Sequence, residues 1–141
     1  NMFSAYGGIR YGTGMSRQFQ YEKTQSRIGA TPWRRFDLYK KNSPVFFADK
    51  VETPLMIMHN DNDGAVPFTQ GIELFMALRR LQKPVWMLVY NGEQHNLKKR
   101  SNRLDLSNRM GQFFDHYLKS AIKPDWMSKG RPLTEKPIQK K

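Results

Sequence analysis

The sequence predicts an α/β fold, with parallel strands flanked by helices. Two short, largely apolar runs, at residues 55–59 and 85–90, are separated by a single amphipathic segment. The first run shows no alternation of apolar and polar residues, which is typical of a central parallel strand covered on both faces. Because the connection between the runs is short and helical, we expect two parallel strands joined by a crossover helix.

The length of the chain suits a single domain. The chain has 141 residues, of which 38% are hydrophobic, and this is enough to fill a core of ordinary size. Apolar residues are concentrated between Leu55 and Leu118, whereas both ends are polar or basic. The ends are therefore either loops or segments whose packing partners lie outside this polypeptide. We expect a partial α/β domain over residues 1–122 and a basic tail over residues 123–141.

Residues 1–22 are rich in glycine, but the spacing does not suit phosphate binding. The glycines are Gly7, Gly8, Gly12 and Gly14. A dinucleotide-binding loop or a P-loop needs a glycine pattern that does not occur here, so we expect an irregular surface segment. Short helical turns are expected over residues 24–42. Thr31-Pro32 predicts a helix start, since proline suits the first helical position, and Ser43-Pro44 predicts a break.

Two amphipathic helices are predicted further along the chain. Residues 68–82 carry a broad apolar stripe and are followed by Lys83-Pro84, where proline stops the helix. Residues 103–121 place apolar side chains at positions i, i+4, i+7, i+8, i+11 and i+12, which form one helix face. The residues of that face are Leu106, Met110, Phe113, Phe114, Tyr117 and Leu118. We expect them to pack in the core rather than to line a ligand site.

Asp63 and His95 follow the two predicted strands. In open α/β sheets, ligands bind beyond the carboxyl ends of the strands, so both side chains are expected at one edge of the sheet. A carboxylate beside an imidazole orients the ring and stabilises its protonated form during proton transfer. The pair therefore indicates acid–base chemistry. The alternative is structural, with Asp63 as a turn or helix-capping residue and His95 as a loop histidine.

The formal net charge is +12, from 24 basic and 12 acidic residues. Such a charge favours anionic partners, but much of it lies in residues 98–103 and in the predicted tail. Binders of single-stranded nucleic acid require aromatic residues interleaved with basic ones, and this chain lacks that arrangement. We therefore expect no nucleic acid among the partners. We also expect no membrane, because the longest uncharged apolar run is residues 85–90.

No metal or other cofactor is expected. The chain has no cysteine, which excludes a thiolate metal site and a disulfide scaffold. The acidic run that ends at Gly64 resembles part of a calcium loop, but such a loop needs an acid or amide at position 59 and a glutamate at position 70. The chain has His59 and Gln70 there. Both reducing and oxidising compartments fit this composition; an extracytoplasmic location is favoured, with a cytoplasmic one as the alternative.

Two motifs, His59 followed by Asp63 to Phe68 and then Tyr90 to His95, resemble motifs of the prolyl oligopeptidase family of serine peptidases. The family has a strand that ends in histidine, a short loop and then Asp-x-x-Val-Pro-Phe, here His59 followed by Asp63 to Phe68. Its second motif is a strand followed by Tyr-Pro-x-Glu-x-His, here Tyr90-Asn91-Gly92-Glu93-Gln94-His95, which lacks the proline. The resemblance covers roughly residues 40–120. It implies the C-terminal portion of an α/β-hydrolase fold, the catalytic domain of this family.

The resemblance also implies roles for individual residues. Asp63 is the acid of a Ser-Asp-His triad, chosen over Asp61 because it stands three residues before Val66. By the same resemblance His95 is the general base, which takes the proton of the nucleophile. It also implies a structural role for His59, and Glu93 is expected to help hold the loop that carries His95.

The nucleophile is absent from the sequence. A triad serine needs a Gly-x-Ser-x-Gly turn, and none of the eight serines has that context. We therefore expect a C-terminal fragment, inactive alone, of a serine peptidase such as a dipeptidyl peptidase. Its expected partners are an oligopeptide substrate, the remainder of the parent chain with a propeller domain, and a second copy joined through an exposed sheet edge. The alternatives are an esterase or other acyl hydrolase of the same fold, and a basic binding module without chemistry.

Overall fold

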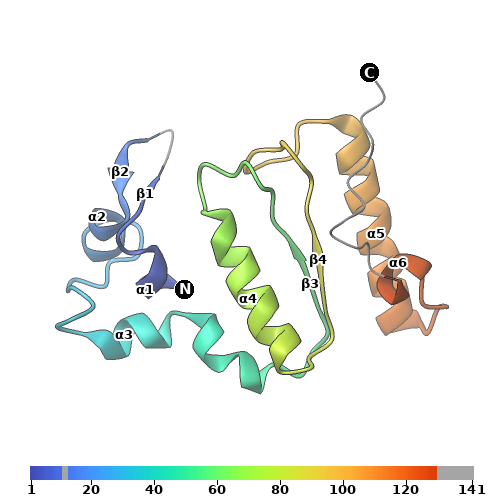
Figure 1. Ribbon diagram of the computed structural model, residues 1–141, viewed down its shortest axis with the longest axis horizontal. Helices are drawn as coiled ribbons and strands as arrows, with labels where there is room; N and C mark the ends of the chain where they lie inside the picture. The colour runs from blue at the N-terminus through green and yellow to red at the C-terminus, as the bar shows by residue number, and fades with distance from the viewer. Residues whose placement is uncertain (11–12, 130–141) are drawn as a thin grey trace. The chain divides into compact units, whose positions relative to one another are not determined.

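The computed structural model describes residues 1–10 and 13–129, which fall into two compact units, one up to Asn102 and one from Arg103 onward. Within these described ranges the elements are, in order, α1 (Met2–Ala5), β1 (Ile9–Arg10), β2 (Met15–Ser16), α2 (Arg17–Glu22), α3 (Phe36–Lys41), the 3-10 helix η1 (Pro44–Lys50), β3 (Leu55–Met58), α4 (Phe68–Arg80), β4 (Val85–Leu88), α5 (Arg100–Lys119) and α6 (Asp125–Ser128). Figure 1 labels the α-helices and strands among these elements. The predicted α/β fold class is confirmed.

Strands β3 and β4 form a parallel pair, as predicted. Their register places Leu55 opposite Val85 and Met58 opposite Leu88. One further bond, from the amide of His59 to the carbonyl of Leu88 at 3.1 Å, continues the ladder beyond the strand ends. The two strands therefore release their following loops at the same end of the sheet (Figure 1).

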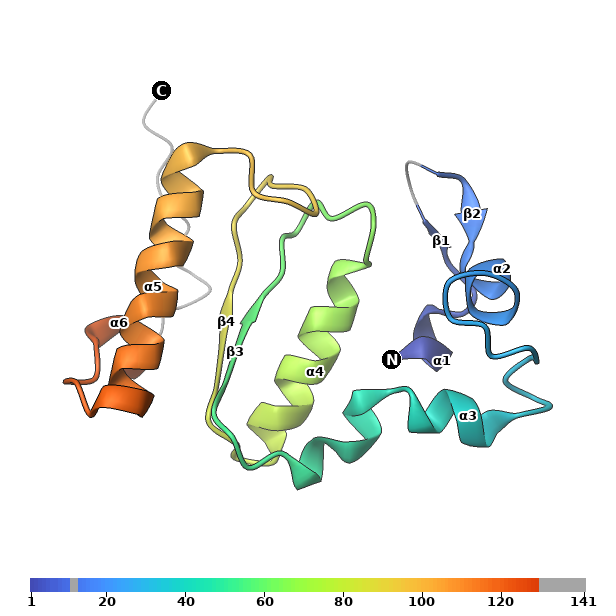
Figure 2. The same ribbon diagram turned by 180° about the vertical axis from the view of Figure 1, so that it is seen from behind.

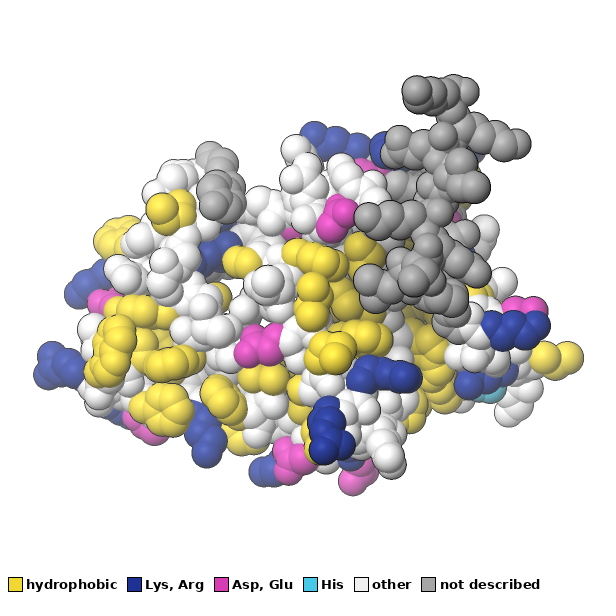
Figure 3. Space-filling view, viewed as in Figure 1, with side chains coloured by type: hydrophobic (Ala, Val, Ile, Leu, Met, Phe, Trp, Pro, Cys, Tyr) yellow, Lys and Arg dark blue, Asp and Glu magenta, His cyan; other side chains and the backbone are white. Residues whose placement is uncertain are grey.

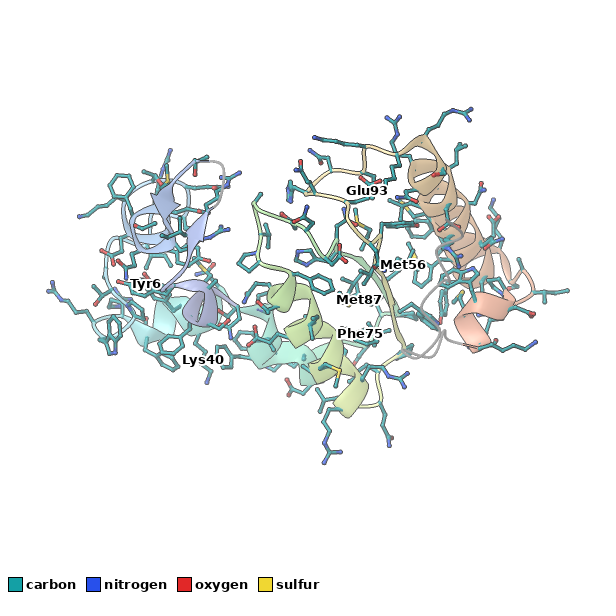
Figure 4. The ribbon with its side chains drawn as sticks, turned by 45° about the horizontal axis from the view of Figure 1, so that its top comes forward. Tyr6, Lys40, Met56, Phe75, Met87 and Glu93 are labelled. Carbon is teal, nitrogen blue, oxygen red and sulfur yellow. The ribbon has the colours of Figure 1, made fainter. Side chains whose placement is uncertain are left out.

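Helix α4 connects the two strands and runs alongside them in both opposite views (Figures 1 and 2). Its fully buried Leu78 forms a core cluster with Ala48 of η1 and Val85 of β4. Phe75 of α4 packs against this cluster and is marked in Figure 4. Burying an apolar side chain of this size stabilises the fold by about 1.5–3 kcal/mol. The amphipathic stripe therefore fixes α4 against the strands.

The N-terminal segment is ordered into short elements, so the expectation of an irregular surface segment was wrong. The Oδ1 of Asn1 accepts amide hydrogen bonds at the start of α1, and the Oγ of Ser16 does the same for α2. The rings of Tyr6 and Tyr21 pack against the fully buried Tyr39 of α3. These caps and aromatic contacts stabilise helices that are too short to form alone. Gly12 lies outside the described residues.

Residues 31–44 differ in part from expectation. Thr31-Pro32 does not start a helix: the carbonyl of Thr31 accepts from the amides of Arg34 and Arg35, which forms a turn, and α3 begins only at Phe36. The predicted break at Ser43-Pro44 is confirmed, because α3 ends at Lys41 and η1 begins at Pro44. Phe3, Trp33 and Phe36 are exposed. Figure 3 shows hydrophobic side chains on one face of the N-terminal region.

The C-terminal unit contains most of α5, which begins at Arg100, three residues before the predicted start, and ends at Lys119. Phe113 contacts the rings of Phe114 and Tyr117 edge-on within this helix. A short helix, α6, lies within the segment expected to be a tail. Trp126 of α6 donates a hydrogen bond to Gln112 at 2.7 Å, which ties α6 to α5. Residues 130–141 of the expected tail lie outside the described residues.

Candidate active site

The loops that follow β3 and β4 bring Asp63 and His95 together. The Nδ1 of His95 lies 2.8 Å from the Oδ2 of Asp63, although 32 residues separate them in the sequence. Parallel pairing explains this contact, because both loops leave the sheet at the same end (Figure 1). Asp61, the other acid of the first loop, accepts a hydrogen bond from the amide of Gly92 at 2.7 Å instead.

The carboxylate of Asp63 is buried and held on both oxygens. Its side chain is 4% exposed, and its Oδ1 accepts hydrogen bonds from the amides of Ala65 at 2.8 Å and Val66 at 2.9 Å. Burial opposes ionisation and raises the pKa of this carboxyl, but the hydrogen bonds from His95, Val66 and Ala65 outweigh burial and hold the pKa below its usual value. The structure therefore favours an ionised, fixed acid.

His95 is oriented by that acid and open to solvent. Because a carboxylate only accepts hydrogen bonds, the Nδ1 of His95 carries the proton shared with Asp63. In the neutral ring the Nε2 then carries the lone pair, which is the arrangement a general base needs. The side chain is 53% exposed, so an approaching group can reach the ring.

Two further hydrogen bonds join the loops beside this pair. The side chain of Asn60, which is 1% exposed, donates from Nδ2 to the carbonyl of Gln94 at 2.6 Å. The Oδ1 of Asp61 accepts from the amide of Gly92. These bonds lie on either side of Glu93 in the second loop. They fix the loop immediately before His95 against the loop that carries Asp63.

Glu93 organises the second loop from within. Its carboxylate accepts hydrogen bonds from the amides of Lys98 at 2.8 Å and Lys99 at 3.0 Å, and from the Nδ2 of Asn102 at 2.7 Å. The Lys98 bond has the largest effect and, with the other two, lowers the pKa of Glu93 against the opposing effect of burial. As expected, Glu93 holds the loop that carries His95, and it lies beyond the end of β4 (Figure 4).

Two further side chains contact the Asp63 loop, and sequence reasoning missed the first of them. Arg17, only 5% exposed, donates a hydrogen bond from Nη2 to the carbonyl of Ala65. The two residues are 48 positions apart, and no sequence pattern predicts their contact. His59 approaches the Oδ2 of Asp63 with its Nε2 at 3.3 Å. The position of His59 at the end of the predicted strand had placed it near this loop, with a structural role. The third histidine, His116, belongs to α5, where its Nδ1 lies 2.9 Å from the carbonyl of Ala121.

The described residues contain neither a metal-binding cluster nor a helix suited to span a membrane. Among residues 1–10 and 13–129, no group of three or more His, Cys, Asp or Glu side chains is arranged to hold a metal ion. In those residues no helix combines the length and apolar character needed to cross a bilayer. The candidate site rests on the contact between Asp63 and His95 at the end of β3 and β4.

Comparison with known proteins identifies relatives of this chain. Dipeptidyl-peptidase 5 of Porphyromonas endodontalis is 28% identical over 129 residues, which are 84% of this chain and 18% of the relative. The acylamino-acid-releasing enzyme of Sus scrofa is 40% identical over 55 residues, 39% of this chain and 8% of the relative. This chain thus spans less than a fifth of the length of these curated relatives.

A solved structure shares the fold. The acylaminoacyl peptidase of Pyrococcus horikoshii superposes with a TM-score of 0.68 at 22% identity, over 91% of this chain and 20% of the other. This likeness supports the partial α/β fold. The model of the prolyl oligopeptidase family matches residues 9–121, which are most of the sequence. The chain belongs to the prolyl oligopeptidase family of serine peptidases.

Proposed function

We propose that this chain supplies the acid and the base of a Ser-Asp-His triad that hydrolyses peptide bonds. One observation carries the proposal: the Nδ1 of His95 lies 2.8 Å from an Asp63 carboxylate whose other oxygen is already held by two backbone amides. An acid fixed in this way orients the imidazole, selects its tautomer and stabilises the imidazolium that forms during catalysis.

In this mechanism His95 moves a proton twice. Its Nε2 takes the hydroxyl proton of the nucleophilic serine as the oxygen attacks the scissile carbonyl carbon. The imidazolium then gives that proton to the amine that leaves when the C–N bond breaks, and an acyl-enzyme remains. A water molecule, deprotonated by the same nitrogen, attacks the ester, and the proton returns to the serine oxygen as the acid product leaves. Asp63 stays ionised throughout.

The serine would stand in another part of a longer protein. None of the serines in this sequence lies in a Gly-x-Ser-x-Gly turn, which holds the hydroxyl at the tip of a strand-to-helix bend. Among the described residues β3 and β4 pair only with each other, so each presents an open edge on which further strands of an α/β sheet can add. We propose that these strands carry the nucleophile and that the 141-residue chain alone is inactive.

The proposed substrates are short peptides. Relatives carry the names dipeptidyl-peptidase and acylamino-acid-releasing enzyme, which name a dipeptide unit and an acylated amino acid. The described site contains the proton-transfer groups, and we propose that the pocket that selects the substrate side chain is formed by the longer protein. Nitroanilides of a dipeptide and of an acetylated amino acid would separate these two substrate classes, and a nitrophenyl ester would reveal simple esterase activity.

Labelling by a fluorophosphonate probe tests the proposal, because the probe reacts with a serine activated by a neighbouring base. In the full-length protein we expect fast labelling of the wild type and of His116→Ala, and slow labelling of His95→Ala. The 141-residue chain should stay unlabelled. Equal labelling of His95→Ala and the wild type would refute the role of His95, and labelling of any serine in the chain alone would refute the missing nucleophile.

A further inference from the structure

The carboxylate of Asp63 contacts a second imidazole. The Nε2 of His59 lies 3.3 Å from the Oδ2 of Asp63, the same oxygen that His95 contacts, and 3.2 Å from the carbonyl oxygen of Val66. The side chain of His59 is 11% exposed, so water competes little for these contacts. His59 therefore joins the acid to the loop that surrounds it.

The chemistry of these neighbours assigns the proton on His59. A carbonyl oxygen and an ionised carboxylate both only accept hydrogen bonds, so the Nε2 that faces them must carry a hydrogen. With this donor, Asp63 is approached by two amides at Oδ1 and by two imidazoles at Oδ2. Three of these groups hydrogen-bond the carboxylate, and the His59 ring stands close against the same Oδ2 as His95, which leaves the carboxylate little freedom to rotate.

The ring of His59 packs closely against Phe68 and Gly71 of helix α4. Phe68 meets this ring edge-on, with centroids 5.5 Å apart and planes at 90°. On helix α4, a Cβ at Gly71 would lie 2.5 Å from the Nδ1 of His59 and 3.0 Å from its Cβ and Cγ. Only glycine at position 71 admits the imidazole in this position. The first turn of α4 therefore sets the direction in which Nε2 points.

We propose that His59 is a positioning residue, which holds the Asp63 carboxylate in the orientation that His95 requires by donating its Nε2 hydrogen to the Val66 carbonyl and the Oδ2 of Asp63. This inference rests on the proposed function. His59 acts through the acid and does not touch the substrate. Its loss should therefore lower kcat and leave KM nearly unchanged, because the acid supports the base during the chemical step.

Two substitutions at this position separate donation from simple packing. His59→Gln keeps an N–H donor at a similar reach, whereas His59→Leu fills space without a donor. In the full-length protein, with a peptide nitroanilide as substrate, we expect His59→Leu to lower kcat by about tenfold or more. Each factor of ten corresponds to about 1.4 kcal/mol in the barrier. His59→Gln should recover most of the loss, and Gly71→Ala, which displaces the ring, should resemble His59→Leu.

The same assay on His95→Ala and His59→Leu separates a failure of the positioning role from a failure of the proposed function. If His95→Ala keeps wild-type activity, the proposed function itself fails. If His95→Ala is inactive but His59→Leu matches the wild type, only the positioning role fails. Equal losses in His59→Gln and His59→Leu would also overturn that role, since the donor would then make no difference.

A measurement on the unmutated protein guards against variants that fail to fold. In protein labelled with ¹⁵N-histidine, long-range proton–nitrogen correlation spectra report which ring nitrogen carries hydrogen. We expect the Nε2 of His59 to be protonated in the folded protein. A ring with Nε2 bare and Nδ1 protonated would overturn the inference, whatever the variants do.

Discussion

Glu93 accepts a hydrogen bond from the Nδ2 of Asn102 at 2.7 Å, and so links the loop that carries His95 to the first turn of α5. The same carboxylate accepts the amides of Lys98 and Lys99. Three donors converge on one buried acid, and the segment between residues 93 and 102 folds around it. The position of His95 thus depends on a side chain two residues before it.

Replacing Glu93 by glutamine should destabilise this loop. The amide group of glutamine presents two hydrogens where the carboxylate accepts, so at least one donor loses its partner. We expect a lower urea midpoint for Glu93→Gln than for the wild type. Glu52→Gln, at an exposed position, is the matched control and should leave the midpoint in place. Equal midpoints for both variants would contradict the role of Glu93.

Alanine at two helical glycines should have opposite effects on stability. Gly71→Ala forces a Cβ against the ring of His59, whereas a Cβ at Gly111 of α5 meets nothing within 4 Å. In a helix interior, alanine is more favourable than glycine by about 1 kcal/mol of folding free energy. Overpacking a side chain lowers stability by about 1–3 kcal/mol. We expect Gly111→Ala to stabilise the protein by up to about 1 kcal/mol and Gly71→Ala to destabilise it. Denaturant unfolding of both variants measures the difference, and stabilisation by Gly71→Ala would refute the close contact.

Truncation of Asn60 should loosen the pairing of the two loops. Asn60→Ala removes the side chain that donates a hydrogen bond to the carbonyl of Gln94. Because Asn60 is almost fully buried, water cannot easily take the place of this donor. A lost hydrogen bond of this kind costs about 1–3 kcal/mol. Asn62→Ala, exposed in the same loop, should cost far less. If the two variants unfold at the same urea concentration, the bond between the loops contributes nothing.

Stability should depend on the ionisation of Asp63. The folded pKa of this carboxyl lies below its usual value, so in acid the unfolded state binds the proton first. The resulting stabilisation is fully present above the unfolded pKa of about 3.9 and is lost as the pH falls through the folded pKa. Unfolding free energies measured between pH 6 and pH 3 should therefore decline less steeply in Asp63→Asn than in the wild type. Identical slopes would show that the carboxyl titrates alike in both states.

The sequence predicted the elements that depend on periodicity. The parallel strands, the crossover helix and the long C-terminal helix follow from apolar spacing that is strong over many residues. The approach of Asp63 to His95 also followed, since neighbouring parallel strands end at one edge of the sheet. These features need no knowledge of contacts between distant side chains.

What the sequence did not predict depends on such contacts. The short N-terminal helices are stabilised by caps and by the packing of Tyr6 and Tyr21 on Tyr39, rather than by their own propensity. The bond from Arg17 to the Ala65 carbonyl joins segments that no pattern relates. The second contact of Asp63, with His59, required the position of Gly71 on the facing helix.

Peptide hydrolysis by Asp63→Asn and Asp61→Asn in the full-length protein tests the central claim most directly. Asparagine at position 63 cannot stabilise the imidazolium of His95, and we expect kcat/KM to fall by about 10⁴-fold, as losses of a triad acid do. Asparagine at position 61 keeps an oxygen for the amide of Gly92, so its kcat/KM should stay close to that of the wild type. An Asp63→Asn enzyme as active as the wild type, or a larger loss in Asp61→Asn, would contradict the assignment of the acid.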